Sequence, residues 1–376
     1  MHYFIIAGEA SGDLHAAQLM RALRRSDPEA RFTFLGGDLM AAEAGCAPLI
    51  HYRDMAFMGF SEVLRHLPKV LGNLRDARRA LTEERPDAFI ATDYPSFNLK
   101  VAKTASEAGI PVFYFISPKL WAWKAWRVKA IRRYVRRMLA IFPFEPAWYA
   151  AHGFRADYVG NPSVAEVDAA LAAAPPREEF LREHALRDHP LIALLPGSRR
   201  GEVRTNLPVM LQAARRFAQY RPVVACAPGL DDDFYRGFTD LPLLRHATFP
   251  LLRHARAALV TSGTATLEAA LAGLPQVVCY RSNGSKLTYD IMKRILKVDY
   301  VSLPNIISGR EIVPEMLLHN CTPDLVAEHL APLLRDTPER AAQLDAYASM
   351  RAILGTRDAA TEAARLITAD LTGKPA

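Results

Sequence analysis

The chain has 376 residues, of which 50% are hydrophobic and 23% are charged, and this is a globular composition. That length is too great for one ordinary hydrophobic core, so it predicts two domains of about 150–200 residues each. The net charge of +7 and the isoelectric point near 9.2 favour an acidic partner, which leaves nucleic acid, an anionic membrane surface and a phosphorylated substrate as alternatives.

The cysteines, histidines and apolar runs exclude several classes of protein. The four cysteines form no CxxC pair and the eleven histidines form no cluster, so we expect reduced thiols in a cytosolic protein and no metal site. No basic region precedes the first apolar stretch, and Glu9 interrupts that stretch, so no secretory signal is expected. No run reaches about 18 apolar residues, so no transmembrane helix is expected either.

The first half alternates predicted strands and helices. Short apolar runs predict the strands, and amphipathic or capped segments predict the helices. The strands are expected at 3–7, 31–36, 87–92, 111–116 and 138–142, with helices at 13–25 and 98–108. This alternation predicts a doubly wound parallel sheet with helices on both faces.

A glycine-punctuated loop follows the first predicted strand and reads AGEASGD. A strand that ends in glycine and serine before a helix leaves backbone N–H groups free to bind phosphate or carboxylate. The loop matches neither the dinucleotide fingerprint nor the P-loop, and an ordinary strand-to-helix turn explains it equally well. The candidate ligand-binding residues here are Gly8, Glu9, Ser11, Gly12 and Asp13.

An apolar stripe with basic flanks occupies residues 58–74. Its spacing fits either a helix face packed on the core or a surface that lies in a membrane interface, and burial is the commoner outcome. If the substrate is a lipid, the membrane-interface alternative is favoured. The stripe's candidate membrane residues are Met58, Phe60, Val63, Leu64, Leu67 and Leu71.

Asp93 follows the predicted strand 87–92 in the sequence TDYPSFN. A carboxylate at the carboxyl end of a strand is placed to act as a general base towards a hydroxyl group. Asp93 is our choice for the base, with Glu9 and Asp13 as rivals, and an aspartate turn that caps the next helix is the alternative. Asn98, in the same motif, is a further candidate on this side.

Tryptophans and basic residues alternate between 121 and 127, and more basic residues follow at helical spacing up to 137. Such a face is most often only solvated. The neighbouring aromatic rings make an anionic ligand or surface about equally plausible here.

The connection between the halves is expected near 160–162, where Gly-Asn-Pro ends the alternation. Strands are then predicted at 191–195, 222–226, 257–261 and 276–280, and a C-terminal helix at 358–371. Two loops offer phosphate ligands: one reads PGSRRGEV, and the other begins at Thr261. Glu268, one turn into the next helix, is placed to hold a ribose unless it is only a solvated helix charge. The candidate donor-binding residues of these loops are Gly197, Ser198, Arg199, Ser262, Gly263, Thr264 and Glu268.

Together these motifs resemble the lipid-A-disaccharide synthases. The matching stretches follow one order over most of the chain: AGEASGD (7–13), MGFSEVL (58–64), TDYPSFN (92–98), SPKLWAW (117–123), FPFE (142–145), LLPGSRRGEV (194–203), SGTATLE (262–268) and VDYVSLPN (298–305). The resemblance implies an α/β protein of the GT-B fold, with two facing Rossmann-like doubly wound domains and a cleft between them. The expected limits are 1–160 for the acceptor-binding and membrane-docking domain, 161–355 for the UDP-sugar-binding domain and 356–376 for a C-terminal helix.

The resemblance also implies the reaction. An inverting transfer without a metal ion or other cofactor would move 2,3-diacylglucosamine from UDP-2,3-diacylglucosamine to the 6-hydroxyl of 2,3-diacylglucosamine 1-phosphate. Asp93 matches the family's aspartate, and Asn305 and Arg281 are added as donor-site candidates without assigned roles. The implied location is cytoplasmic and peripheral to the anionic inner-membrane surface. We expect the C-terminal helix to pack on its own N-terminal domain or on that of a neighbouring chain in a homodimer.

Two other classes of function stay open at this point. One is another GT-B glycosyltransferase or a UDP-sugar epimerase, against which the stripe at 58–74 favours a lipid substrate. The other is a basic nucleic-acid-binding protein that uses residues 121–137. RNA-recognition signatures are missing, so no nucleic-acid partner is expected.

Overall fold

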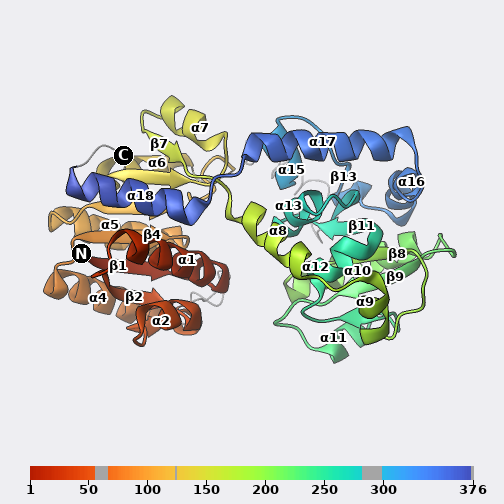
Figure 1. Ribbon diagram of the computed structural model, residues 1–376, viewed down its shortest axis with the longest axis horizontal. Coiled ribbons are helices and arrows are strands. Elements are labelled where there is room, and N and C mark those ends of the chain that lie inside the picture. Colours follow the sequence, from red (N-terminus) through yellow and green to blue (C-terminus); the bar gives the residue numbers. More distant parts are fainter. Residues whose placement is uncertain (56–66, 123–124, 282–298, 374–376) are drawn as a thin grey trace. The chain divides into compact units, whose positions relative to one another are not determined.

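The computed structural model describes residues 1–55, 67–122, 125–281 and 299–373. Its contacts divide the chain into two compact units. Unit 1 consists of Met1–Pro162 and Thr356–Ala376, and unit 2 consists of Ser163–Gly355. The C-terminal segment therefore returns to the unit in which the chain begins (Figure 1).

Unit 1 is built on a parallel sheet in the order β3-β2-β1-β4-β5-β6-β7. Its strands are β1 (His2–Ala7), β2 (Arg31–Gly36), β3 (Ile50–His51), β4 (Ala88–Thr92), β5 (Val112–Phe115), β6 (Arg137–Ala140) and β7 (Ala156–Tyr158). The central strands β1, β4 and β5 are apolar and almost wholly buried, as expected of strands covered by helices on both faces. This confirms the predicted doubly wound sheet, although β3 and β7 were too short to be predicted.

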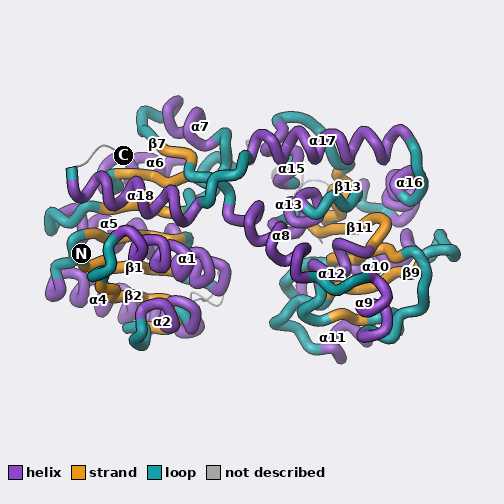
Figure 2. The backbone as a smooth tube through the Cα atoms, in the orientation of Figure 1, coloured by secondary structure: helices purple, strands orange, loops and turns teal. Residues whose placement is uncertain are grey.

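Helices flank this sheet, and Figure 2 shows them around the strands. They are α1 (Ala10–Ser26), α2 (Asp38–Ala44), α4 (Leu67–Glu84), α5 (Pro95–Glu107), α6 (Val128–Tyr134), α7 (Glu145–Ala151) and α18 (Ala359–Thr372), with 3₁₀ turns η1 (Tyr52–Asp54) and η2 (Ala125–Arg127). The C-terminal helix predicted at 358–371 is α18, which buries its alanines and Ile367 and packs against α1 of its own chain. Two of the helices begin before their predicted starts, because Pro95 opens α5 and the small residues after Glu9 are already helical.

Unit 2 repeats the architecture with a parallel sheet in the order β10-β9-β8-β11-β12-β13. Its strands are β8 (Leu191–Leu195), β9 (Arg221–Ala225), β10 (Leu243–Leu244), β11 (Ala255–Thr261), β12 (Gln276–Tyr280) and β13 (Glu315–Leu317). Its helices are α8 (Pro162–Ala173, which begins at the boundary), α9 (Arg177–Glu183), α10 (Arg200–Ala214), α11 (Asp232–Arg236), α12 (Thr248–His254), α13 (Thr264–Leu271), α15 (Leu303–Ser308), α16 (Pro323–Leu333) and α17 (Pro338–Leu354), with a 3₁₀ turn η3 (Leu318–Asn320).

The last three helices begin at side-chain caps that the sequence encodes locally. Thr322, Thr337 and Asp358 each accept a hydrogen bond from the backbone N–H three residues further on. Such a bond satisfies one of the free donors at a helix start and contributes about 1 kcal/mol. The ends of α16, α17 and α18 are therefore set by short-range chemistry.

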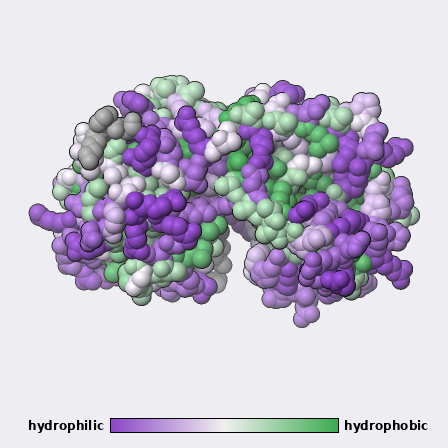
Figure 3. All heavy atoms as spheres, viewed as in Figure 1, coloured by the Kyte–Doolittle hydropathy of each residue, from purple (hydrophilic) through white to green (hydrophobic). Residues whose placement is uncertain are grey.

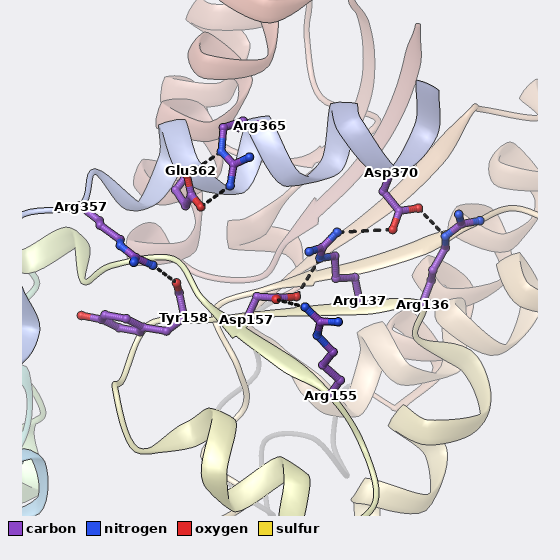
Figure 4. Close-up of polar contacts among 9 residues, drawn as sticks. All are labelled: Arg136, Arg137, Arg155, Asp157, Tyr158, Arg357, Glu362, Arg365 and Asp370. Carbon is purple, nitrogen blue, oxygen red and sulfur yellow. Dashed lines mark hydrogen bonds and ion pairs between the residues drawn. The ribbon is translucent and has the colours of Figure 1, made fainter. Parts of the chain in front are cut away.

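Ion pairs fasten α18 to the edge of the unit 1 sheet (Figure 4). Asp370 of α18 lies 2.5 Å from Arg136 and 3.6 Å from Arg137, and Arg137 also pairs with Asp157 of β7 at 2.8 Å. The predicted basic face through residue 137 is therefore wrong at its end: α6 stops at Tyr134, and the next two arginines bind α18 instead of facing an external anion.

Hydropathy varies along the helices and over the surface of the described residues. Hydrophilic side chains alternate with smaller apolar areas on the face drawn in Figure 3. Across the described segments, no helix combines the length and the hydropathy needed to cross a bilayer. The same segments contain no group of three or more histidine, cysteine or acidic residues able to hold a metal ion.

Candidate functional site

The strand order places the predicted site residues at one topological position in each unit. In unit 1 the chain leaves β1 towards β2 on one side, while β4 pairs with β1 on the other. In unit 2 the strands β8 and β11 have the same relation. Ligands of doubly wound sheets bind beyond the carboxyl ends of the strands at this switch point. Gly8 and Asp93 follow β1 and β4, and the two predicted phosphate loops follow β8 and β11.

Asp93 is held beside the loop that follows β1. The backbone N–H of Gly8 donates to Asp93 Oδ1 at 2.9 Å, so two residues 85 positions apart are in contact. The other oxygen, Oδ2, is buried and has no hydrogen-bond partner among the described residues. A buried acceptor without a partner is costly, and it is the arrangement expected of a group that meets a substrate proton.

Gly12 makes the room that the Asp93 carboxylate occupies. It lies in the first turn of α1, so the predicted loop through Gly12 is shorter than expected. A Cβ atom added to Gly12 would lie 1.9 Å from Asp93 Oδ2. Glycine is required at this position because any side chain would displace the carboxylate.

The electrostatic surroundings hold Asp93 ready to take up a proton. Burial raises the pKa of Asp93 well above its ordinary value, and the charge of Glu9 adds to the rise, while the hydrogen bond from Gly8 opposes it. Burial disfavours the ionised carboxylate because the charge loses its hydration. A carboxylate with a raised pKa is a stronger base than an exposed aspartate, as a general base requires.

The backbone at Asp93 is strained and supported from two sides. Both Asp93 and Tyr94 have left-handed conformations, with φ of 50° and 40°. The Asp93 carbonyl accepts hydrogen bonds from Asn98 Nδ2 at 2.8 Å and from Tyr114 Oη at 2.6 Å. Such conformations cost about 1–3 kcal/mol each and persist where neighbours fix them. Asn98 therefore supports this backbone through its Nδ2, while its Oδ1 is buried and has no hydrogen-bond partner among the described residues.

The other residues of the AGEASGD motif have different roles. Asp13 is buried and accepts the backbone N–H groups of Gly37 at 2.7 Å and of Leu39 and Met40 at 3.1 and 3.2 Å. Both of its oxygens thus serve the start of α2, which favours a structural role over that of a base. Glu9 instead precedes α1 and accepts a hydrogen bond from the exposed Ser11 hydroxyl at 2.9 Å.

In unit 2 the first phosphate loop is already occupied by a carboxylate of the chain. Gly197 has φ of 114°, which favours glycine, and it is followed by Ser198 and Arg199, whose N–H groups donate to Glu202 Oε2 at 3.0 and 3.3 Å. Glu202 forms a capping box with Arg199 at the start of α10. These two N–H groups therefore bind a carboxylate of the chain itself, and the diphosphate-binding role of Ser198 and Arg199 stays a prediction.

The second loop leaves its helix end open. Gly263 has φ of 148° and precedes α13, and no side chain of the described residues caps the start of this helix, so the first N–H groups of the helix, from Thr264, are placed to meet a ligand. The Ser262 hydroxyl donates to the Val301 carbonyl at 2.8 Å. Glu268 lies one turn into α13, and burial together with the charge of Glu166 raises its pKa.

Asn305 is completely buried, and its neighbours use both ends of its amide. Its Nδ2 donates to the Val313 carbonyl at 2.9 Å and to Glu315 Oε1 at 2.8 Å, and its Oδ1 accepts from Ile312 and Val313 at 2.7 and 2.9 Å. Its amide therefore has no hydrogen bond left for a ligand. We infer that Asn305 holds the surrounding backbone in place and does not bind a ligand itself.

Glu315 continues this support towards the second phosphate loop. Its carboxylate accepts the backbone N–H groups of Val301 and Ser302 at 3.0 and 2.9 Å. The Val301 carbonyl in turn accepts the hydrogen bond of the Ser262 hydroxyl. Arg281, which follows β12, is exposed, and its backbone N–H donates to Asn206 Oδ1 at 2.7 Å.

The apolar stripe at 58–74 is only partly within the described residues. Met58, Phe60, Val63 and Leu64 lie outside them. Leu67 and Leu71, on α4, have 41% and 51% of their surface exposed, whereas Leu74 is buried in the core. The core-facing alternative therefore holds for Leu74 and fails for the first two leucines of α4.

The tryptophan-rich segment also has both buried and exposed side chains. Trp121 is buried, and its indole N–H donates to a carboxylate of the chain, so its ring is not available for stacking. Trp126 is 67% exposed, and the Arg127 guanidinium lies 5.6 Å from the centre of its ring.

Four residues that sequence reasoning missed hold the site loops in place through hydrogen bonds. They are Tyr94, Tyr114, Glu145 and Glu315, and their partners are distant in sequence. Tyr94 and Glu145 do lie in motifs that the sequence singled out, TDYPSFN and FPFE. These motif positions were the available signal, but nothing local indicated what they contact.

Comparison with known sequences identifies close relatives. The family model described as lipid-A-disaccharide synthetase matches residues 3–367. The chain is 41% identical over 372 residues to a lipid-A-disaccharide synthase of Myxococcus xanthus, with 96% of each chain covered. It is 39% identical over 377 residues to that of Chromobacterium violaceum, covering 96% of this chain and 95% of the relative.

Comparison with solved structures bears on the fold. A UDP-GlcNAc 2-epimerase of Neisseria meningitidis, bound to UDP-GlcNAc, matches with a TM-score of 0.68 at 12% identity over 100% of both chains. The calicheamicin glycosyltransferase matches with a TM-score of 0.58 at 19% identity, covering 99% of this chain and 98% of that one. At these identities the likeness concerns the fold alone, and with the two doubly wound sheets it confirms the predicted GT-B fold.

Proposed function

The chain belongs to the lipid-A-disaccharide synthetase family, and on that premise we propose that it joins two acylated glucosamines. The donor is UDP-2,3-diacylglucosamine and the acceptor is 2,3-diacylglucosamine 1-phosphate. The products are the β-1,6-linked disaccharide 1-phosphate and UDP. The observation that carries the proposal is the buried, unpartnered Oδ2 of Asp93 at the switch point of unit 1.

Asp93 takes the proton of the acceptor in this reaction. The 6-hydroxyl oxygen attacks the anomeric carbon of the donor, and its proton passes to Asp93 Oδ2 while Gly8 keeps Oδ1 in place. The new C–O bond forms as the bond from the anomeric carbon to the diphosphate oxygen breaks. A single in-line displacement inverts the anomeric carbon, and UDP leaves with the bonding electrons.

Unit 2 binds the departing UDP. The open start of α13 offers N–H groups and the positive end of the helix dipole to the diphosphate. Arg199, 67% exposed beside the other loop, supplies a guanidinium whose fork matches phosphate oxygens, while Glu268 accepts hydrogen bonds from the ribose. Because Glu202 holds the N–H groups of Ser198 and Arg199, we assign the larger part of phosphate binding to α13.

Replacing the donor-site side chains is expected to weaken UDP binding. Loss of a charged hydrogen bond costs about 1.5–3 kcal/mol, so Arg199→Ala and Glu268→Ala should each raise the Kd of UDP roughly tenfold to a hundredfold in calorimetric titration. Arg216→Ala is the matched control, because Arg216 follows α10, far along the chain from its loop end, and pairs with Asp324. Activity should also survive chelators; a strict magnesium requirement would contradict the assignment.

Both proposed substrates carry acyl chains, so we propose that unit 1 docks on the cytoplasmic face of the inner membrane. The docking surface consists of the exposed leucines of α4, Leu67 and Leu71, with Lys69 and Arg75 beside them. Basic residues near an anionic surface contribute about 1 kcal/mol each, although Lys69 also pairs with Asp54 at 2.7 Å. The homodimer expected from the resemblance stays a prediction.

The docking proposal predicts release from vesicles. Leu67→Ser combined with Leu71→Ser should lower the fraction bound to phosphatidylglycerol-containing liposomes in a flotation assay, while UDP binding by unit 2 stays unchanged. Both leucines are already exposed, so the thermal unfolding temperature should hardly move. Leu74→Ser, at a buried position of the same helix, should instead destabilise the fold. Unchanged flotation of the double variant would place the docking surface elsewhere.

The direct test of the proposed function is product formation. Purified protein incubated with both acylated sugars should release UDP and form the disaccharide 1-phosphate, as seen by mass spectrometry. Conversion of the UDP-sugar to an epimer without the acceptor would instead favour the epimerase alternative. A salt-dependent gel shift with RNA would favour the nucleic-acid-binding alternative.

A further inference from the structure

Glu145, the first residue of α7, is a completely buried acid that the proposed reaction does not use. Its Oε2 accepts the backbone N–H groups of Ile141 and Phe142 at 3.2 and 3.0 Å. Its Oε1 accepts the indole N–H of Trp121 at 3.2 Å. Glu145 therefore joins the segment after β6 to the segment after β5.

The pocket around Glu145 is made of donors. The Ser117 hydroxyl also interacts with Glu145, and it donates to the Pro118 carbonyl at 3.1 Å and lies 2.8 Å from Tyr149 Oη. Burial raises the pKa of Glu145 to about 7, although these hydrogen bonds favour the ionised form. Three N–H groups donate to this carboxylate, and an ionised carboxylate is the form that accepts all of them.

The segment that Glu145 holds, loop 117–121, borders Asp93. It follows β5, which pairs with β4 so that Phe115 lies opposite Thr92, the residue before Asp93. Ile116, at the start of the loop, has φ of 68°, which is a strained conformation for a β-branched residue. Strain of this kind persists only where other contacts fix it, and the bonds to Glu145 are such contacts.

Loop 117–121 carries one charged residue, Lys119, which is exposed. The charge of Lys119 interacts favourably with Glu145 and with Glu9. Glu9 interacts unfavourably with Asp93. A cation beside Glu9 offsets this repulsion, so the position of Lys119 bears on the readiness of Asp93 to lose its proton.

We propose that Glu145 is a positioning residue for the transfer reaction, which anchors loop 117–121 next to the end of β4 and thereby keeps the Lys119 charge near Glu9. The inference rests on the proposed function, because it assigns Asp93 as the base. Glu145 itself is enclosed and touches no substrate. It acts through Trp121 and Ser117 on the loop.

The kinetics of Glu145→Gln test this inference at a pH of about 8.5, where Glu145 is ionised in the unaltered protein. The amide places N–H groups where the pocket already supplies donors, so the loop should shift. We expect kcat to fall roughly tenfold to a hundredfold, as for other small misplacements of a site, with the KM of the UDP-sugar unchanged. Lys119→Met should lose a similar factor, and the double variant should lose no more than the worse single variant.

Two further variants separate positioning from loss of the fold. Leu81→Val removes a buried methylene near the C-terminal end of α4, at a side chain that forms none of the hydrogen bonds to Glu145, and it should lower stability without changing kcat. If Glu145→Gln does not fold, Trp121→Phe deletes the indole N–H bond together with part of a buried ring, and it should lower kcat less, in the same direction. A normal kcat in Glu145→Gln would overturn the inference. If Glu145→Gln does not fold, a normal kcat in Trp121→Phe would overturn it instead. It would also be overturned if the losses of the two single variants multiply in the Glu145→Gln, Lys119→Met double variant.

The experiments distinguish a failure of the positioning role of Glu145 from a failure of the proposed function. If the unaltered protein forms no disaccharide, the proposed function fails. If it forms the disaccharide and Asp93→Asn is inactive while Glu145→Gln is normal, only the positioning role fails.

Discussion

Replacing Asp93 with asparagine is expected to lower kcat about 10²–10⁴-fold, which is the usual contribution of a positioned general base. Asparagine keeps the size of the side chain, and its Oδ1 can still accept the Gly8 N–H, so the backbone of the loop should stay in place. The amide cannot take up the hydroxyl proton. Measurement of disaccharide formation under saturating substrates gives the effect directly.

The pH profile distinguishes loss of the base from loss of binding. Because burial raises the pKa of Asp93, kcat/KM of the unaltered protein should rise with pH as Asp93 loses its proton, over a range above that of an ordinary aspartate. Asp93→Asn should lack this limb of the profile while UDP binding to unit 2 is unchanged. Near-normal turnover in the variant would transfer the role to Glu9, whose carboxylate lies in the same corner of unit 1.

Replacing Gly12 with alanine is expected to lower kcat up to about a hundredfold although it adds a single methyl group. The new Cβ would lie 1.9 Å from Asp93 Oδ2 and 2.8 Å from its Cγ, so the carboxylate must move. Displacement of a reacting group by about 1 Å is enough for a loss of that size. The clash is with the end of a side chain, so the fold should survive, which thermal unfolding checks.

Gly72→Ala is the matched control for this substitution. Gly72 lies inside α4, and an added Cβ would meet no atom within 4 Å. Alanine is the better helix former by about 0.5–1 kcal/mol, so this variant should be slightly more stable and fully active. A Gly12→Ala variant with the same kinetics as Gly72→Ala would show that the Asp93 carboxylate has more freedom than its surroundings indicate.

The general architecture and the place of Asp93 at the end of β4 could be predicted because their signals are local. Buried parallel strands are continuous apolar runs, so β1, β4 and β8 can be read from a few consecutive residues. Parallel strands also end at the same edge of the sheet. Motif residues that follow such runs, such as Asp93 after β4, must therefore lie at the edge where ligands bind.

The tertiary structure decided which of the predicted polar residues are free to meet a ligand. Asp13 and Asn98 were equal candidates in the sequence, but their hydrogen bonds go to backbone groups 24 and 5 residues away. Glu202 accepts the hydrogen bonds of two N–H groups in the first phosphate loop. Nothing in the sequence PGSRRGEV shows which N–H groups are bonded to the chain itself and which are free. Satisfaction of a polar group depends on where the chain returns in space.

The sequence by itself determined the two doubly wound sheets, the family and the position of Asp93, since each depends on short apolar runs or on residues within one motif. Only the tertiary structure decided that Gly8 and Gly12 shape the Asp93 carboxylate and that Glu145 joins two motifs 24 residues apart. The physical reason is that burial and hydrogen bonding are set by contacts between distant segments. A pattern in the sequence locates a side chain on its strand or helix, whereas the charge and freedom of that side chain depend on neighbours that the pattern does not contain.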